Sequence, residues 1–302
     1  MKKASAFAPG HISGFFLAQD ECGDPVKRGS KNCGPCIESG VVTSVEIEVS
    51  SSTDLDILID GKGNLAETTQ AAVKETLELA GKSVSGEIRH SVQAPIGAGF
   101  GMSGAGAIGA VLALSEALNL NLTRDEIGSI AHRAEVVSKT GLGDVSPQML
   151  GGIVIGLKPG ALPYWDWEKI TVEGELKILC ASAGSLKTSD FLGDQDFMER
   201  SKVLGEAAME GLLSDRTIEG FMKVSRDFAL NLRVFNENFK QILEEISSES
   251  PLGASAVMLG KAIFAPLPSS EVEHMRRVFL EYFDSKSVFL TSIDFEGARI
   301  LS

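Results

Sequence analysis

Cysteine is scarce in this 302-residue chain, and its first residues carry no apolar leader. Four cysteines are too few for the disulfide framework with which small secreted domains replace a large core. The opening Met-Lys-Lys-Ala-Ser lacks the apolar stretch of a signal peptide. We therefore expect a reduced, cytoplasmic protein.

Positive charge is also in short supply. Lys and Arg number 28 against 41 Asp and Glu, so the formal net charge is −13. Nucleic acids and anionic membrane surfaces are bound through basic patches, so neither is expected as the main partner. The chain also lacks internal repeats and low-complexity tracts, and 43% of its residues are hydrophobic. A chain of this length and composition can bury a large core, which excludes general disorder.

One long uncharged run, from Ser91 to Ser115, has the length of a membrane span but not its composition. Its first half, from Pro95 to Gly101, is interrupted by a proline and three glycines, which do not form a lone spanning helix. Its second half continues into a segment, residues 104–118, that is apolar nearly all round. This pattern predicts a loop followed by a helix buried in the core.

Strand and helix signals alternate along the chain without the strict order of a doubly wound sheet. Strand-like runs cover residues 4–8, 12–18, 40–49, 55–60, 87–92, 152–156, 176–181, 261–265 and 287–294. Helical spacing covers residues 65–80, 104–118, 123–139, 270–283 and several segments between 195 and 246. Thr123 and Glu126 match a capping box at the start of the third of these helices. The order predicts an α+β protein, divided near Lys158–Pro163 into units 1–160 and 161–302.

The sharpest sequence feature is a glycine-rich loop between a predicted strand and the buried helix. The segment from Ala94 to Gly109 contains six glycines, counting Gly109 itself. Small residues let backbone N–H groups surround an anion, and the helix N-terminus adds partial positive charge, so a phosphate is the expected ligand. Close packing of helix on sheet is the alternative explanation.

Three phosphate-binding loops compete for this segment. The P-loop is excluded because no lysine follows in the helix. Gly99, Gly101 and Gly104 match G-x-G-x-x-G, but that fingerprint requires a second strand ending in an acidic residue. The sequence instead predicts a helix–helix connection over residues 119–127. The third candidate begins with proline and places Ser103 at the helix start, where its hydroxyl can bind a metal.

The run Pro95-x-Gly-x-Gly-x-Gly-x-Ser103-x-Ala105 resembles the central ATP-binding motif of the GHMP kinases, which phosphorylate small-molecule hydroxyls. Ala8-Pro-Gly near the N-terminus, and Glu135 followed by the segment 143–152, agree with this resemblance. It implies a GHMP-kinase-like two-part fold, with a ribosomal-S5-like nucleotide unit and a C-terminal ferredoxin-like unit, and a homodimer. The ATP-binding residues that it implies are Pro95, Gly97, Gly99, Gly101, Ser103 and Gly104.

The same resemblance implies three catalytic roles. Ser103 and Glu135 would hold Mg²⁺, and Asp144 would act as general base toward the substrate hydroxyl. Each carboxylate has a simpler alternative. Glu135 fits a solvated side chain paired with Lys139 four residues later, and Asp144 fits an Asx-turn cap.

Within the family, the phrase from Phe7 to Phe16 together with Gly29-Ser30 is similar to the archaeal members that act on pantoate. This implies formation of 4-phosphopantoate for coenzyme A biosynthesis, with homoserine, mevalonate and shikimate as alternative acceptors. The substrate-binding candidates are Ser30, Arg28, His11, His132, Lys187 and Thr188.

Three positions depart from the family pattern. Met102 replaces a common serine, His11 replaces a common lysine, and the third glycine motif is reduced to the segment 253–260. The lost groups leave a second class open, a non-catalytic sensor that binds a metabolite on the same fold.

Cys33-Gly-Pro-Cys36 matches the thioredoxin redox sequence, whose reactive cysteine lies at a helix N-terminus. Here a predicted strand follows instead of a helix. Cys22, Cys33 and Cys36 offer three thiolates for zinc, but the fourth cysteine, Cys180, is far along the chain. We expect a loop with buried thiols and no redox or zinc chemistry.

Overall fold

A computed structural model describes residues 1–19, 22–184 and 195–301. In this part of the chain, nine strands form a large sheet in which β13, β1, β3, β6, β4 and β5 are neighbours in that order, while β2 and β7 pair with β3 and β8 pairs with β7. Their bounds are β1 (Lys2–His11), β2 (Phe15–Gln19), β3 (Gly29–Ser50), β4 (Asp54–Ile59), β5 (Lys62–Gly63), β6 (Ser83–Val92), β7 (Ile153–Lys158), β8 (Asp166–Ile170) and β13 (Arg299–Leu301).

A second sheet of four described strands has the order β10, β11, β9, β12. These strands are β9 (Leu176–Ser182), β10 (Ser255–Val257), β11 (Ala262–Pro268) and β12 (Val288–Ser292). The α-helices are α1 (Glu67–Ala80), α2 (Met102–Leu118), α3 (Arg124–Ser138), α4 (Val145–Leu150), α6 (Gln195–Ser214), α7 (Ile218–Asn231), α8 (Glu237–Glu249) and α9 (Val272–Leu280), with a short 3₁₀ turn at Ser269–Glu271.

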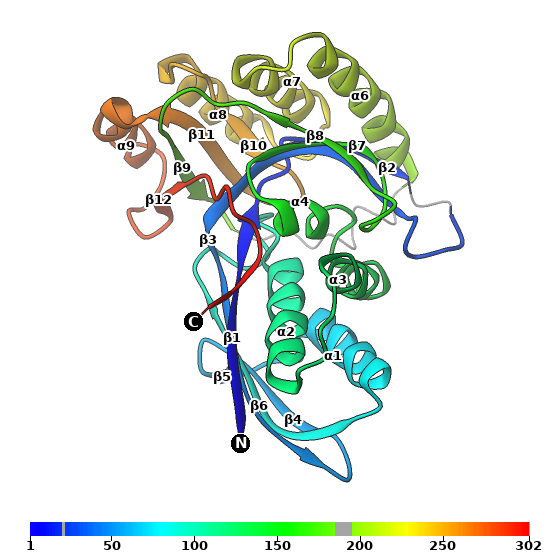
Figure 1. Ribbon diagram of the computed structural model, residues 1–302. Helices are drawn as coiled ribbons and strands as arrows, with labels where there is room; N and C mark the ends of the chain where they lie inside the picture. The colour runs from blue at the N-terminus through cyan, green and yellow to red at the C-terminus, as the bar shows by residue number, and fades with distance from the viewer. Residues whose placement is uncertain (20–21, 185–194, 302) are drawn as a thin grey trace.

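The helices pack on the two sheets in separate groups. In Figure 1, α1, α2 and α3 pack together beside the large sheet, and α8 and α9 lie beside the second sheet. Helix α6 packs on β2 of the large sheet and on α7, which in turn contacts both β2 and β10. Among the described strand pairs, β4 with β6 is parallel and the others are antiparallel. The predicted α+β class is confirmed, and the arrangement differs from a doubly wound sheet. The division at residue 160 stays a prediction, and β8 and β13 pair across it.

The helices beside the large sheet lie where the local sequence patterns predict them. The predicted buried helix is α2, which is buried along almost its whole length and packs on β1 and β3. Thr123 caps α3 with both hydrogen bonds of the predicted capping box. The predicted helix over residues 65–80 is α1, which ends at Gly81 in the left-handed conformation. Within the described residues, no helix has the length and apolarity needed to cross a bilayer.

The expectation of a loop around Cys33 and Cys36 is wrong, because both lie in the first half of β3. Cys33 pairs with a residue of β7, and Cys36 pairs with His11 of β1. Pro35, which has no N–H, uses its carbonyl to accept the Ile12 N–H at 3.0 Å. The side chain that Gly34 lacks would collide with the Ile12 carbonyl. Pairing with two neighbours therefore overrides the turn tendency of Gly-Pro.

The burial predicted for these thiols is confirmed. Cys33 and Cys36 are fully buried, and burial raises the pKa of both thiols, which disfavours the thiolate needed for redox or zinc chemistry. Cys36 instead donates its S–H to the Pro147 carbonyl, 3.1 Å away. Within the described ranges, no group of three His, Cys, Asp or Glu side chains is placed to hold a metal ion.

Candidate active site

The glycine-rich loop leads directly into the N-terminus of α2. Gly97, Gly99 and Gly101 have φ values of 75°, 88° and 69°, in the left-handed region that glycine tolerates best. The helix starts at Met102, so the hydroxyl-bearing Ser103 lies in its first turn, with its side chain exposed. Free N–H groups in this first turn and the helix dipole make the end of α2 suitable for binding an anion.

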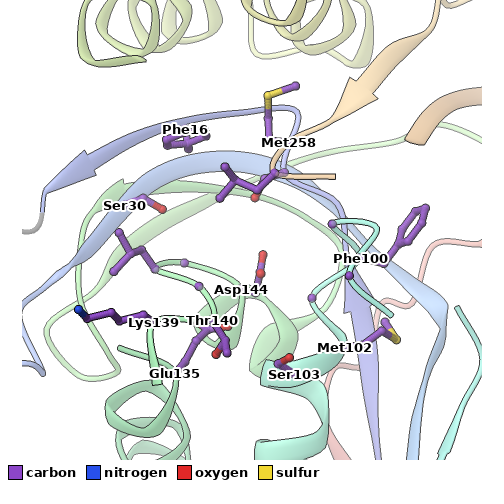
Figure 2. A pocket seen from close by; sticks show the side chains of 18 of the residues that line it. Phe16, Ser30, Phe100, Met102, Ser103, Glu135, Lys139, Thr140, Asp144 and Met258 are labelled. Carbon is purple, nitrogen blue, oxygen red and sulfur yellow. The ribbon is translucent and has the colours of Figure 1, made fainter. Parts of the chain in front are cut away.

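A cavity of about 340 Å³ opens in front of this loop. Figure 2 shows that Ser103 lies on one side of the cavity, while Glu135 and Asp144 come from the segments opposite the loop. The structure therefore brings these three predicted residues together. The lining consists of Ser13, Phe16, Ser30, Asn32, Glu67, Ile96, Gly97, Gly99, Phe100, Gly101, Met102, Ser103, Glu135, Ser138, Lys139, Thr140, Gly141, Leu142, Gly143, Asp144, Met258 and Leu259.

Glu135 is buried, with 1% of its surface exposed, so the alternative of a solvated side chain is wrong. Its Oε2 has no hydrogen-bond partner among the described residues. Burial raises the pKa of this carboxyl group, and the nearby Asp144 raises it further. A buried carboxylate with an unused oxygen beside a second carboxylate is a site that a cation would stabilise.

Glu135 fits into its position because two neighbouring residues are glycines without side chains. A Cβ added to Gly141 would lie 2.5 Å from Glu135 Oε1, and one added to Gly104 would lie 3.1 Å from the same oxygen. Gly104 does not itself line the cavity but keeps α2 close to α3 at this point. A side chain at either position would therefore displace the Glu135 carboxylate.

Asp144 stands at the N-cap position of α4, yet its side chain makes no capping hydrogen bond within the described structure. Its Oδ1 instead lies 2.8 Å from Nδ1 of His11, whose side chain is completely buried. The Asx-turn alternative is therefore wrong. A carboxylate facing the cavity and held from behind by an imidazole is arranged to accept or orient a proton.

The predicted substrate-binding residues separate into groups. Ser30 is buried and lines the cavity. Arg28 and His132 are not among the lining residues: the Arg28 Nε donates to the Cys22 carbonyl at 2.6 Å, and His132 Nε2 lies 2.8 Å from the Arg28 carbonyl. Lys187 and Thr188 fall outside the described residues.

Two further predicted residues lie outside the cavity wall. His11 contacts Asp144 from behind and is absent from the lining. Pro95 borders a separate surface cavity formed with residues of the second sheet and α8, although its carbonyl accepts the Ala98 N–H within the loop. Both residues therefore shape the site through their neighbours.

The reduced third glycine motif does reach the loop. Met258 and Leu259 line the cavity, and the Met258 N–H donates to the Ser13 carbonyl at 3.0 Å. A Cβ added to Gly99 would lie 2.7 Å from the Met258 carbonyl oxygen. The segment 253–260 therefore closes one side of the glycine loop by backbone contact.

Sequence reasoning missed Asn32 and Gln148. Asn32 lines the cavity and donates from Nδ2 to the Gly143 carbonyl at 2.9 Å. The signal was available in principle, because Asn32 is two residues from Ser30 and alternate residues of a strand share a face. Gln148 is completely buried behind the cavity, and its sequence position carries no comparable signal.

A second, largely apolar cavity of about 250 Å³ adjoins the first. The two share Glu67, Ile96, Met102, Ser103 and Thr140. Its remaining walls include Val41, Ile59, Leu65, Val92 and His90. The start of α2 therefore lies between two chambers. The polar chamber is lined by Glu135 and Asp144, and the largely apolar chamber is lined by neither.

Comparisons with known proteins agree with this geometry. The profile described as the GHMP kinases N terminal domain matches residues 64–152. Pantoate kinase from Methanocaldococcus jannaschii is 33% identical over 258 residues, which cover 85% of this chain and 90% of the relative. Pantoate kinase from Thermococcus kodakarensis is 31% identical over 276 residues, which cover 90% of each chain.

Solved structures extend the likeness over the whole chain. A protein described as a phosphotransferase related to the CoA biosynthesis pathway matches with a TM-score of 0.89 at 27% identity, covering 99% of this chain and 98% of the other. A homoserine kinase from Cytophaga hutchinsonii matches with a TM-score of 0.73 at 18% identity, covering 100% and 98%, and shares the fold.

Proposed function

Because the chain belongs to the GHMP kinase family, we propose that it transfers the terminal phosphoryl group of ATP to the primary hydroxyl of pantoate, which gives 4-phosphopantoate. The observation that carries the proposal is the convergence of Ser103, Glu135 and Asp144 on one cavity at the start of α2. The acceptor is supported by the relatives named pantoate kinase, which match most of the chain at 31% to 33% identity.

The triphosphate would lie against the glycine loop. Gly97, Gly99 and Gly101 allow main-chain N–H groups to approach the phosphates, and the N-terminus of α2 favours their negative charge. The apolar chamber next to this helix end suits the adenine ring, because aliphatic side chains line it within reach of the loop. The two chambers thus match the two chemically different parts of a nucleotide.

Ser103 and Glu135 would hold Mg²⁺, since the unpartnered, buried carboxylate oxygen of Glu135 and the exposed hydroxyl of Ser103 are hard oxygen ligands facing one cavity. When bound, such an ion neutralises charge on the β- and γ-phosphates. Glu135 also provides a negative charge in a dry environment, so it favours the nucleotide–metal complex over the free nucleotide.

Asp144 would accept the proton of the attacking hydroxyl. As the bond from that oxygen to the γ-phosphorus forms, the bond to the bridging oxygen of ADP breaks and the proton passes to the carboxylate. His11 fixes the direction of the carboxylate through its hydrogen bond to Oδ1. On the acceptor side, Ser30 and Asn32 offer a hydroxyl and an amide for a hydroxy acid.

The decisive experiment measures ADP release by the purified chain with Mg-ATP and pantoate, homoserine, mevalonate or shikimate. We expect turnover with pantoate, and substitution Asp144→Ala should lower kcat by about 10²-fold or more while ATP binding changes little. Preference for another acceptor would show that pantoate is not the substrate, and the assignment as a kinase would stand. Nucleotide binding without ADP release for any acceptor would instead identify a metabolite sensor.

The homodimer and the cytoplasmic location remain parts of this proposal. The homodimer rests on the family resemblance, and the location rests on the few cysteines. Light scattering of the purified chain at micromolar concentration tests the first, and fractionation of cells that produce the chain tests the second.

A further inference from the structure

Gln148 connects the two halves of the site although it lines no part of the cavity. Its side chain is fully buried, and Nε2 donates to the carbonyl oxygen of Gly101 at 2.8 Å. Its main-chain N–H donates to the Asp144 carbonyl at 3.1 Å. One residue therefore contacts both the residue that precedes α2 and the proposed general base.

The Gly101 carbonyl is a sensitive point in the loop. It also accepts the N–H of Ala105, the first main-chain hydrogen bond of α2. A Cβ added to Gly101 would lie 2.8 Å from Gln148 Nε2 and 3.2 Å from the Asp144 carboxyl carbon. Gln148 is therefore hydrogen-bonded to the loop, and Asp144 lies close enough to leave no room for a side chain at Gly101, so we expect a displacement of Gln148 to move the loop relative to the carboxylate.

The position of α4, the helix that carries Gln148, depends on contacts with other parts of the chain. With six residues, α4 is too short to be stable by its internal hydrogen bonds. Three successive carbonyls of α4 accept hydrogen bonds from separate parts of the chain. Pro147 accepts from the Cys36 thiol, Gln148 accepts from the Ala298 N–H at 2.9 Å, and Met149 accepts from the Arg124 guanidinium.

Ala298 belongs to a C-terminal segment, residues 294–301, that is itself fixed. Asp294 is buried; its Oδ1 accepts the Gly297 N–H at 2.7 Å and its Oδ2 lies 2.8 Å from Nη1 of Arg299. Its main-chain carbonyl accepts the Gly152 N–H at 2.7 Å, two residues beyond α4. The segment ends in β13, which pairs with β1.

We propose that Gln148 is a positioning residue that sets Asp144 against the glycine loop, and that the segment 294–301 holds Gln148 in place from behind. The inference rests on the proposed phosphoryl transfer for its kinetic consequence. Phosphoryl transfer depends on the alignment of the attacking oxygen with the γ-phosphate, and Asp144 and the loop fix the two partners.

The test replaces Gln148 by methionine, which keeps the length of the side chain but removes the amide. The matched control is Ser146→Ala on the same helix. Ser146 is also buried and donates to a backbone carbonyl, that of Gly160 at 3.2 Å, outside the site. We expect Gln148→Met to lower kcat by about tenfold or more, with less than about a threefold change in either KM. Ser146→Ala should keep kcat within about twofold of the wild-type value. The melting temperatures of Ser146→Ala and Gln148→Met should be similar.

Arg299→Gln provides a second variant that touches neither Gln148 nor the cavity. It removes the charge opposite Asp294 and should lower kcat in the same direction, by less than Gln148→Met. Equal kcat values for Gln148→Met and Ser146→Ala would overturn the role of Gln148. An unchanged kcat for Arg299→Gln, with a lowered one for Gln148→Met, would overturn the role of the C-terminal segment.

Hydrogen exchange separates this inference from the proposed function. In Gln148→Met, the main-chain amides of residues 97–105 should exchange about tenfold faster than in Ser146→Ala, whatever the acceptor. If the wild-type chain phosphorylates none of the acceptors, the proposed function fails, and this exchange difference still decides whether Gln148 fixes the loop. Equal exchange in the two variants would overturn the inference.

Discussion

Nδ1 of His11 lies 2.8 Å from Oδ1 of Asp144, although the two residues are 133 positions apart. The imidazole is fully buried, whereas the carboxylate is 22% exposed toward the cavity. The main-chain N–H of His11 also donates to the Phe100 carbonyl at 2.9 Å, within the glycine loop. His11, which stands where the family commonly has a lysine, therefore contacts both the glycine loop and the proposed base.

Removing this contact should impair turnover more than binding. We expect His11→Leu to lower kcat by about tenfold or more, because Asp144 loses the donor that orients it, with little change in the affinity for ATP. His11→Asn is the matched variant, since an asparagine Nδ2 occupies nearly the position of the imidazole Nδ1. Steady-state kinetics should show most of the activity retained in His11→Asn, and equal losses in both variants would contradict this role.

Glu135→Gln should stabilise the protein while it impairs activity. The folded state raises the pKa of Glu135, so the ionised form disfavours folding, and stability is lost as pH rises above the pKa of the unfolded chain. Replacing the carboxylate by an amide should raise the free energy of unfolding at pH 7.5, measured without divalent ions, by about 1–3 kcal/mol. Urea titration measures the gain.

The same variant should lose about 10²-fold in kcat, because the charge opposite the phosphates is gone. Glu206→Gln, on the exposed surface of α6, is the matched control, because it removes the same charge from a solvated position and should leave the free energy of unfolding nearly unchanged. A Glu135→Gln protein that is less stable than wild type would show that the carboxylate forms favourable contacts in the free protein.

Gly99→Ala should weaken both the fold and nucleotide binding. Gly99 has a φ of 88°, and a Cβ there would lie 2.7 Å from the Met258 carbonyl oxygen. We expect a loss of more than about 1 kcal/mol in unfolding free energy and a rise in the KM for ATP. Gly61→Ala isolates the cost of the backbone conformation, because Gly61 has a φ of 76° and no atom within 4 Å of its added Cβ. Similar losses in both variants would rule out a specific contact with the segment 253–260.

His90 should make the stability of the protein depend on pH. Burial lowers its pKa to about 4, and its two nitrogens contact the hydroxyls of Thr43 and Thr69 at 2.8 and 3.1 Å. The unfolded chain therefore binds the proton more readily, so this stabilisation is complete above about pH 6.5 and is lost as pH falls through 4. The loss amounts to about 3 kcal/mol.

Denaturant unfolding at several pH values between 4 and 7 should show a smaller decline for His90→Gln than for wild type. His274→Gln, at a histidine whose side chain is 44% exposed, should leave the decline unchanged. The same slope in wild type and in His90→Gln would contradict the assignment.

The parts of the fold that the sequence predicts are those set by neighbours along the chain. The apolar run of α2, the capping box at Thr123 and the stop at Gly81 each depend on residues within a few positions. The first half of β3 is different, because Gly34-Pro35 reads locally as a turn and only pairing with β1 and β7 makes it a strand. Elements as short as α4 and β13 carry too few residues for a periodic signal.

For the site, Ser103, Glu135 and Asp144 were predicted from the resemblance to a family rather than from their spacing. Gln148 could not be predicted, because its contact with Gly101 spans 47 positions and its role depends on where α4 lies. Arg28 and His132 illustrate the reverse case, since both have suitable chemistry but contact each other and the Cys22 carbonyl rather than the cavity.

The pairing of β1 with β13 joins Ser5 to Leu301 in register. A nascent chain on the ribosome therefore cannot complete the large sheet until residue 301 has emerged. Until then, one edge of β1 is open, and α4 lacks the hydrogen bond from Ala298. Catalytic competence should accordingly appear only after β13 has been synthesised, later than formation of the glycine loop itself.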